Sequence, residues 1–155
     1  MTRFHLLDRI DAWTPGVRLS GRKLTSSAED IWADTGDGPV LPVPLVLESL
    51  CQAGTWLVLL STDYRRRAAL LGVEDASFGA DVRPGDVLLL DAELTSWSAD
   101  AAVLDGTVRA VRAGGEVTVL TATGVLCALM DAAELDDPAA TRRMGERLTR
   151  AAVTP

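Results

Sequence analysis

The chain has few of the residues that bind metals or form disulfide bonds: one histidine, His5, and two cysteines among 155 residues. Cys51 and Cys127 are far apart in the sequence, and neither has a neighbouring histidine. We therefore interpret both cysteines as small buried side chains, and we expect neither a disulfide bond nor a first-row metal site.

Positive charge is also scarce. The chain has 15 Lys and Arg residues against 22 Asp and Glu, which gives a net charge of -7 and an isoelectric point of about 4.6. A nucleic-acid-binding protein needs a basic stripe that displaces counterions from phosphates, and no such stripe is visible. Nucleic acid is therefore excluded as the expected partner.

Long uncharged apolar runs are missing. The most hydrophobic stretch, 45–60, carries Glu48 and Gln52 and is shorter than the ~20 apolar residues that cross a bilayer. The first nine residues carry charges where a secretory signal would have its apolar core. With 48% hydrophobic residues, the chain is expected to be one soluble, cytoplasmic globular protein that does not enter a membrane.

The most informative feature is a carboxylate on an apolar helix. Pro44 predicts a helix start, and nearly every residue from 44 to 60 is apolar. At about 100° per residue, Glu48, Gln52 and Thr55 fall on one narrow stripe. The alternative is an ordinary solvated face, but a helix apolar on its other faces is normally buried. We predict that Glu48 lines an apolar pocket, where lost solvation lets a carboxyl exchange protons near neutral pH.

The rest of the chain predicts an antiparallel sheet that covers this helix. Residues 16–25 form one expected strand, and 86–97, 101–112 and 116–130 form three more, separated by turn residues. Only a short segment connects the helix to the turn at 83–86. The single apolar helix is the one candidate to cover the apolar face of the sheet. We therefore predict an α+β fold, an antiparallel sheet wrapped around one long central helix.

The end of the chain differs in composition. Residues 1–131 are expected to form the single domain, and 132–155 a polar, alanine-rich C-terminal extension. Within the extension, Asp137 is a candidate N-cap and Pro138 a candidate first residue of a short helix.

Several segments resemble, in the same order, those of the 3-hydroxyacyl-(acyl carrier protein) dehydratases of bacterial fatty-acid and polyketide synthesis. Glu48 and Gln52 fall where that family has the catalytic acid of its helix and a following glutamine. Other matching positions are Phe4, Leu6 and Asp8-Arg9 of the opening segment, Thr25 at the end of the first long strand, the turn at 39–42 and Pro84-Gly85-Asp86 before a strand. The resemblance implies the hot-dog fold, a dimer, and a substrate carried on the phosphopantetheine of an acyl carrier protein, with no further cofactor.

The chain departs from the family at two positions. The family has its catalytic histidine in a Gly-His-Phe-Pro-Gly loop fourteen residues before the acid, and Asp34 occupies that position here. His5 matches a structural part of the family, so we interpret it as a packing or surface residue. The family glycine at the helix start, whose N–H is thought to hold the thioester carbonyl, is Val43. Its N–H can still polarise a carbonyl, although the Val43 side chain and the Pro44 ring crowd the approach.

The resemblance implies that the histidine and the acid of one pocket come from different protomers. We therefore favour a heteromeric dehydratase in which this chain supplies Glu48, with Gln52 beside it, and a hot-dog homologue supplies the histidine. The chain alone would then be inactive. Val43, Pro44 and Cys51 are the candidate substrate-binding residues.

Two other functions remain open at this point. One is a non-catalytic hot-dog subunit that stabilises a partner or binds an acyl thioester. The other is a homodimeric thioesterase in which Asp34 of one protomer meets Glu48 of the other, although Asp34 can equally be a solvated loop residue. Arg65, Arg66 and Arg67 are candidate contacts for the acidic acyl carrier protein, with plain solvated arginines as the alternative.

Overall fold

The computed structural model describes residues 5–153, so Phe4 of the family-like opening segment lies outside it. Within these residues the chain forms eight strands and three helices. In chain order they are β1 (Arg9–Thr14), β2 (Arg18–Leu24), β3 (Ala33–Asp34), β4 (Pro39–Val40), α1 (Val43–Ser61), β5 (Arg66–Phe78), β6 (Val87–Trp97), β7 (Ala101–Arg112), β8 (Gly115–Asp131), α2 (Ala132–Leu135) and α3 (Pro138–Leu148).

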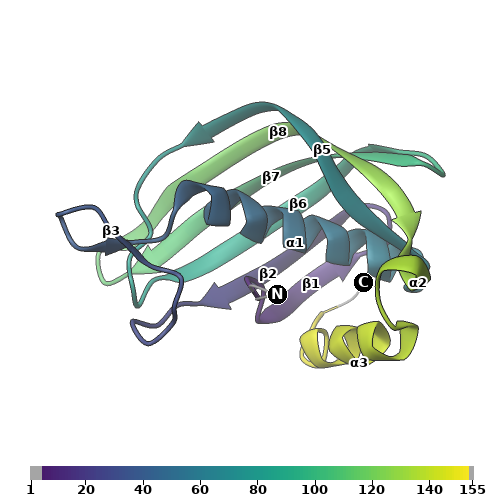
Figure 1. Cartoon of the computed structure of the whole chain (residues 1–155), viewed down its shortest axis with the longest axis horizontal. Coiled ribbons are helices and arrows are strands. Elements are labelled where there is room, and N and C mark those ends of the chain that lie inside the picture. The colour runs from purple at the N-terminus through teal and green to yellow at the C-terminus, as the bar shows by residue number, and fades with distance from the viewer. Residues whose placement is uncertain (1–4, 154–155) are drawn as a thin grey trace.

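Six strands form one antiparallel sheet in the order β1-β2-β6-β7-β8-β5. Figure 1 shows this sheet curving around α1, which lies along its concave side. The short strands β3 and β4 form a separate hairpin before α1. The predicted fold class is confirmed: an antiparallel sheet wraps one long helix, as in the hot-dog fold.

The contact between α1 and the sheet forms the core. Ala53, Leu57 and Leu59 of α1 are fully buried, together with leucines of β6 and β8. Burial of each leucine contributes about 1.5 to 3 kcal/mol to folding. Gly106 of β7 permits the close approach, because a Cβ atom there would meet the side chain of Leu50 and the carbonyl oxygen of Asp91.

By length and composition alone, α1 could cross a membrane, with a mean hydropathy of 1.6 over its most apolar 18 residues. The core helix of a globular domain has the same properties, and half of that window is buried inside the fold. The position of α1 at the centre of the sheet accounts for its apolar sequence.

The sequence pattern does not predict β5, where it indicates only a short connecting segment. β5 pairs with β8 and forms the edge of the sheet. An edge strand has less of its surface packed on the core, so its residues show no regular alternation of buried and exposed side chains. Leu70, Leu71 and Phe78 are all exposed.

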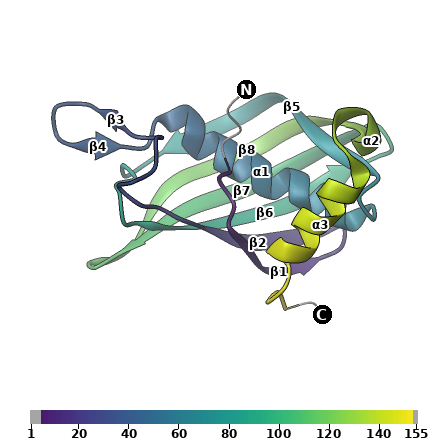
Figure 2. The same cartoon turned by 60° about the horizontal axis from the view of Figure 1, so that its bottom comes forward.

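The helix termini follow from local chemistry. α1 begins at Val43, one residue before the expected Pro44, and Pro44 occupies a first-turn position that needs no N–H donor. α3 begins at Pro138, and the Asp137 carboxylate accepts hydrogen bonds from the N–H groups of Ala139 and Ala140. Figure 2 shows α3 crossing the C-terminal half of α1.

Candidate functional site

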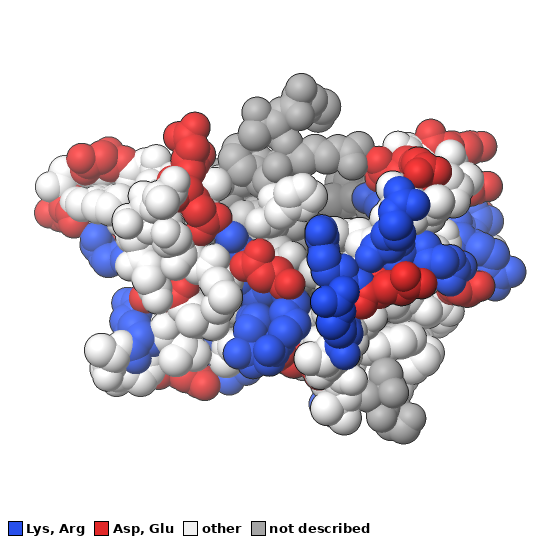
Figure 3. Space-filling view, turned by 90° about the horizontal axis from the view of Figure 1, so that it is seen from below, with Lys and Arg blue, Asp and Glu red and all other residues white. Residues whose placement is uncertain are grey.

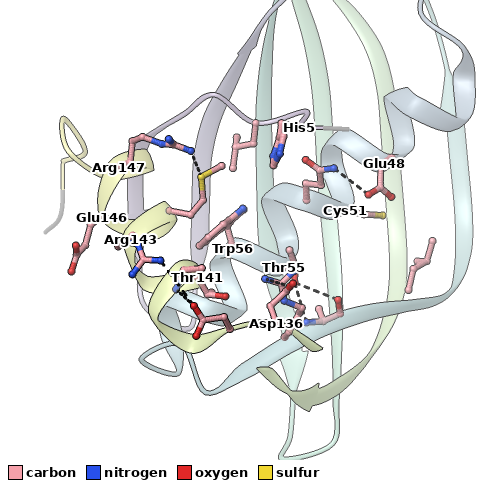
Figure 4. A pocket seen from close by; sticks show the side chains of 18 of the residues that line it. His5, Glu48, Cys51, Thr55, Trp56, Asp136, Thr141, Arg143, Glu146 and Arg147 are labelled. Atoms are coloured by element: carbon pink, nitrogen blue, oxygen red, sulfur yellow. Dashed lines mark hydrogen bonds and ion pairs between the residues drawn. The ribbon is translucent and has the colours of Figure 1, made fainter. Parts of the chain in front are cut away.

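A cleft of about 1280 Å³ lies between α1, the start of β5, α3 and the N-terminal segment. We call it the α1–α3 cleft. Figure 4 shows it from close by, with side chains from α1 on one side and from α3 on the other. The residues that bear on its chemistry are His5, Glu48, Cys51, Gln52, Thr55, Trp56, Arg67, Met144 and Arg147.

Glu48 lines this cleft, on the stripe of α1 that the sequence indicates. Its Oε1 accepts a hydrogen bond from Nε2 of Gln52 at 3.2 Å. The side chain is exposed, so the prediction of a carboxylate sheltered in an apolar pocket is wrong for the single chain. The reason is that Glu48 faces the space of the cleft and does not pack against another element.

The other members of the stripe hold the surrounding segments in place. Oε1 of Gln52 accepts a hydrogen bond from the backbone N–H of Leu6 at 2.8 Å. The Thr55 hydroxyl accepts one from the backbone N–H of Ala68, on β5, at 3.1 Å. The polar stripe therefore ties both the N-terminal segment and β5 to α1.

This tether brings His5 into the cleft, which the sequence analysis does not anticipate. His5 is exposed and lines the cleft, on the side toward Glu48 (Figure 4). It carries the one imidazole of the chain. The contact that places it joins residues 46 positions apart, so sequence spacing contains no signal for it.

Cys51 is half-buried in the cleft wall. Burial, reinforced by the nearby Glu48 carboxylate, raises the pKa of the Cys51 thiol to about 12. At neutral pH this side chain is therefore an uncharged wall group and not a nucleophile. Cys127, buried in β8, is also a free thiol.

The remaining residues expected at the site lie elsewhere in the single chain. Asp34 is exposed on β3, and its Oδ1 accepts a hydrogen bond from the N–H of Gly36 at 2.9 Å. Val43 and Pro44 are exposed at the N-terminus of α1 and do not line the cleft. In Figure 1 the β3–β4 hairpin projects at the end of the molecule opposite α3. One chain therefore does not bring Asp34 and Glu48 together in this cleft.

The three consecutive arginines do not share one face. Arg66 and Arg67 are neighbours on β5, where successive side chains point to opposite faces, and Arg65 precedes the strand. Arg67 lines the cleft and pairs with Asp136 at 3.2 Å. Nε of Arg65 instead donates a hydrogen bond to the carbonyl oxygen of Thr62 at 2.9 Å, and Arg66 is not a lining residue. The expected basic cluster is therefore not one continuous patch on the cleft.

Further arginines reach the cleft from α3: Arg143, Arg147 and, just beyond the helix, Arg150. Their spacing of four and three residues places them on one face of the helix, which is a signal that the sequence does contain. Across residues 5–153, no three or more His, Cys, Asp and Glu side chains are grouped so as to hold a metal ion.

No protein-family model matches the chain. Individual relatives do. The chain is 34% identical to the 3-hydroxyacyl-(acyl-carrier-protein) dehydratase FabZ of Enterococcus faecalis over 108 residues, which cover 68% of this chain and 77% of the relative. It is also 34% identical to FabZ of Levilactobacillus brevis over 118 residues, covering 75% and 77%. With FabZ of Chloroflexus aggregans it shares 39% identity over 93 residues, covering 59% and 65%.

Solved structures resemble the whole fold at low sequence identity. A Streptococcus mutans protein bound to acetyl CoA superposes with a TM-score of 0.63 at 16% identity, covering 84% of this chain and 94% of that one. A thioesterase family protein from Silicibacter pomeroyi gives 0.62 at 21% identity, covering 79% and 84%. A hexameric thioesterase from Yersinia pestis gives 0.56 at 15% identity, covering 75% and 85%. These neighbours support the fold.

Proposed function

Because the chain belongs to the FabZ family of 3-hydroxyacyl-(acyl-carrier-protein) dehydratases, we propose that it is one subunit of a dehydratase for carrier-bound 3-hydroxyacyl thioesters. Glu48 supplies the acid of the pocket, and a hot-dog partner subunit supplies the imidazole. The observation that carries this proposal is the position of Glu48 in the lining of the α1–α3 cleft. The resemblance to the family supports it, because by that resemblance Asp34 stands where the family has its histidine.

The reaction needs three groups. A base removes the proton from C2, an acid protonates the hydroxyl on C3 as the C–O bond breaks, and a donor stabilises negative charge on the thioester oxygen. Water is the product that leaves. Glu48 performs one of the two proton transfers, and the imidazole performs the other. The N–H of Val43, at the positive end of α1, is the candidate donor to the thioester oxygen.

Two features suit a dimer in which subunits exchange groups. β5 is an edge strand of 13 residues with exposed Leu70, Leu71 and Phe78, and such an edge pairs readily with another strand. The β3–β4 hairpin projects from the end of the molecule opposite α3 (Figure 1), where a neighbouring subunit can meet it. A partner hairpin with a histidine would complete this chain's cleft. This chain's hairpin would bring only Asp34 to the partner, which leaves one working pocket per heterodimer.

The substrate class follows from the family. The acyl chain arrives as a thioester on the phosphopantetheine arm of an acyl carrier protein, and no other cofactor takes part. Such a reaction belongs to fatty-acid or polyketide synthesis in the cytoplasm. Of the three arginines predicted to contact the carrier protein, Arg67 is the one that reaches the cleft.

The test compares the purified chain, a hot-dog homologue that has the family's Gly-His-Phe-Pro-type loop, and a mixture of the two, each with a 3-hydroxyacyl thioester of the carrier protein. We expect dehydration from the mixture and none from this chain alone. Glu48→Gln should reduce the rate by at least about 100-fold, the usual contribution of a general acid or base. Glu134→Gln, an exposed change on α2 outside the cleft, is the matched control. Full activity of the Glu48→Gln mixture would contradict the proposal.

His5→Gln separates the two sources of an imidazole. If the partner supplies it, this variant dehydrates as fast as the unchanged chain in the mixture. Dehydration by this chain alone that disappears in His5→Gln would instead place the working imidazole on this polypeptide. Release of free thiol from an acyl thioester by the chain alone would favour a thioesterase that uses Glu48 and Asp34.

A further inference from the structure

The wall that α3 contributes to the α1–α3 cleft has two distinct faces. Thr141, Gly145 and Leu148 are buried and form the face that packs on the rest of the protein. Arg143 and Arg147, followed by Arg150, line the cleft. The cleft-facing part of α3 therefore presents arginines, beside Ala140 and Met144, to the space that contains Glu48.

This wall is held in place at both ends. Before it, the N–H of Ala132 donates a hydrogen bond to the carbonyl oxygen of Arg65 at 2.9 Å. After it, the N–H of Val153 donates one to the carbonyl oxygen of Asp11, on β1, at 2.9 Å. Between them, Arg142 stacks over the ring of Tyr64 at 4.6 Å. The cleft-facing arginines thus extend from a fixed helix.

Acidic side chains also line the cleft near these arginines, namely Asp136, Asp137 and Glu146, but the α3 arginines form few close ion pairs with them. Within residues 5–153, neither Arg147 nor Arg150 forms an ion pair, and Arg147 contacts the weakly accepting sulfur of Met144. Arg143 reaches Asp137 only at 4.0 Å, with both side chains largely exposed. In Figure 3, which views the molecule from below, Lys and Arg side chains on this face lie beside Asp and Glu side chains.

We propose that Arg143, Arg147 and Arg150 bind the phosphate of the phosphopantetheine arm that carries the substrate. The inference rests on the proposed function and names a binding site within it. A guanidinium offers a planar fork of donors that matches phosphate oxygens. Glu48 and Trp56 are eight residues apart on α1, so the cleft extends about 12 Å along the helix. When its phosphate is bound at α3, the extended arm runs along α1 and brings its thioester toward Glu48. In Figure 4, Glu48 lies across the cleft from Arg147.

The experiment measures binding and needs no turnover. Calorimetry compares 4′-phosphopantetheine with pantetheine, which lacks the phosphate, on the complete chain in its active assembly. We expect phosphopantetheine to bind about 10-fold more tightly, as expected for charge-assisted hydrogen bonds to a phosphate. Replacing Arg143, Arg147 and Arg150 together with Gln should remove that difference and leave pantetheine binding unchanged. A triple Lys variant, which keeps the charge, should retain part of it.

The control is Arg18→Gln, which removes one positive charge from an exposed position of β2 outside the cleft and should preserve the preference for phosphate. Thermal unfolding verifies that each variant is folded. Equal affinity for the two compounds, no measurable binding of either, or an unchanged preference in the triple Gln variant would each overturn the proposal. Because these outcomes do not depend on dehydration, they are separate from failure of the proposed function, which is read from Glu48→Gln.

Discussion

The Nε2 atom of Gln52 donates a hydrogen bond to the Oε1 atom of Glu48 at 3.2 Å, from one helical turn further along α1. The other end of the same amide accepts the backbone N–H of Leu6. One side chain therefore orients the carboxylate of the cleft and holds the N-terminal segment that carries His5. The sequence analysis treats Gln52 as part of the catalytic group, and its contacts give it a positioning role.

Two substitutions separate these tasks. Gln52→Leu removes both hydrogen bonds, whereas Gln52→Glu keeps an acceptor for Leu6 and places a second carboxylate beside Glu48. Both should lower dehydration by the assembled enzyme about 10-fold, the effect of one lost hydrogen bond. Exchange of the Leu6 amide hydrogen should become fast in Gln52→Leu and stay slow in Gln52→Glu. Wild-type activity of Gln52→Glu would show that Glu48 needs no support from this amide.

A second prediction concerns the packing of α3 against Tyr64. Gly145 lies against the ring of Tyr64, and a Cβ atom at that position would collide with the ring carbons and the hydroxyl. Gly145→Ala should therefore destabilise the protein by about 1 to 3 kcal/mol, although alanine favours helices. Urea unfolding measures the loss, and hydrogen exchange over 138–148 shows whether α3 detaches. Gly114→Ala, where a Cβ meets open space, is the control, and equal stability of the two variants would contradict the packing argument.

The third prediction concerns a buried carboxylate outside the cleft. Asp86 is 5% exposed and accepts hydrogen bonds from Arg112 at 2.7 Å and from the backbone N–H of Arg83 at 2.9 Å. Asp86→Ala leaves the Arg112 guanidinium without its partner and should cost about 2 to 4 kcal/mol in the free energy of unfolding. Asp81→Ala removes an exposed carboxylate and should cost less than about 1 kcal/mol. Similar losses for both variants would rule out the buried pair as a main source of stability.

Several of the residues that match the family form hydrogen bonds that stabilise the fold and have no role in the proposed reaction. The Thr25 hydroxyl donates a hydrogen bond to the carbonyl oxygen of Asp86 at 2.6 Å, so two of the matching positions stabilise one junction. Asp8 accepts the N–H of Leu24 at 2.7 Å. The sheet and the central helix can be predicted because regularly spaced buried positions require apolar residues at the same spacing in the sequence. Leu104, Val108 and Ala110 of β7 are buried in this way.

The parts of the molecule that sequence reasoning missed depend on contacts between distant residues. The edge strand β5 has no regular apolar face, and its place beside β8 is set by pairing alone. The α3 wall depends on Tyr64 meeting Gly145, and the position of His5 depends on Gln52 meeting Leu6. Glu48 lines a cleft, but it is exposed there and not sheltered in an apolar pocket as predicted. Its exposure was not foreseen, because the pattern of one helix does not show which of its neighbours belong to the same chain.

The last prediction concerns the dependence of stability on pH. The pKa of the Cys51 thiol is about 12 in the folded protein, against an ordinary value of 9.0. As pH rises above 9.0, this thiol ionises in the unfolded chain but stays protonated in the folded one. The stability that it contributes is therefore intact below pH 9.0 and is lost progressively between pH 9.0 and about 12.

Cys51→Ala removes this dependence, while Cys127 stays the same in both proteins. Between pH 8 and 10.5, the difference in unfolding free energy should shift in favour of the variant by about 1 to 2 kcal/mol. At pH 8, about one Cys51 in ten thousand is a thiolate in the folded protein and about one in ten in the unfolded chain. Alkylation of Cys51, followed by mass spectrometry of its peptide, should therefore require unfolding. Labelling of the folded protein as fast as a free thiol would show that Cys51 ionises readily and belongs among the reactive groups of the cleft.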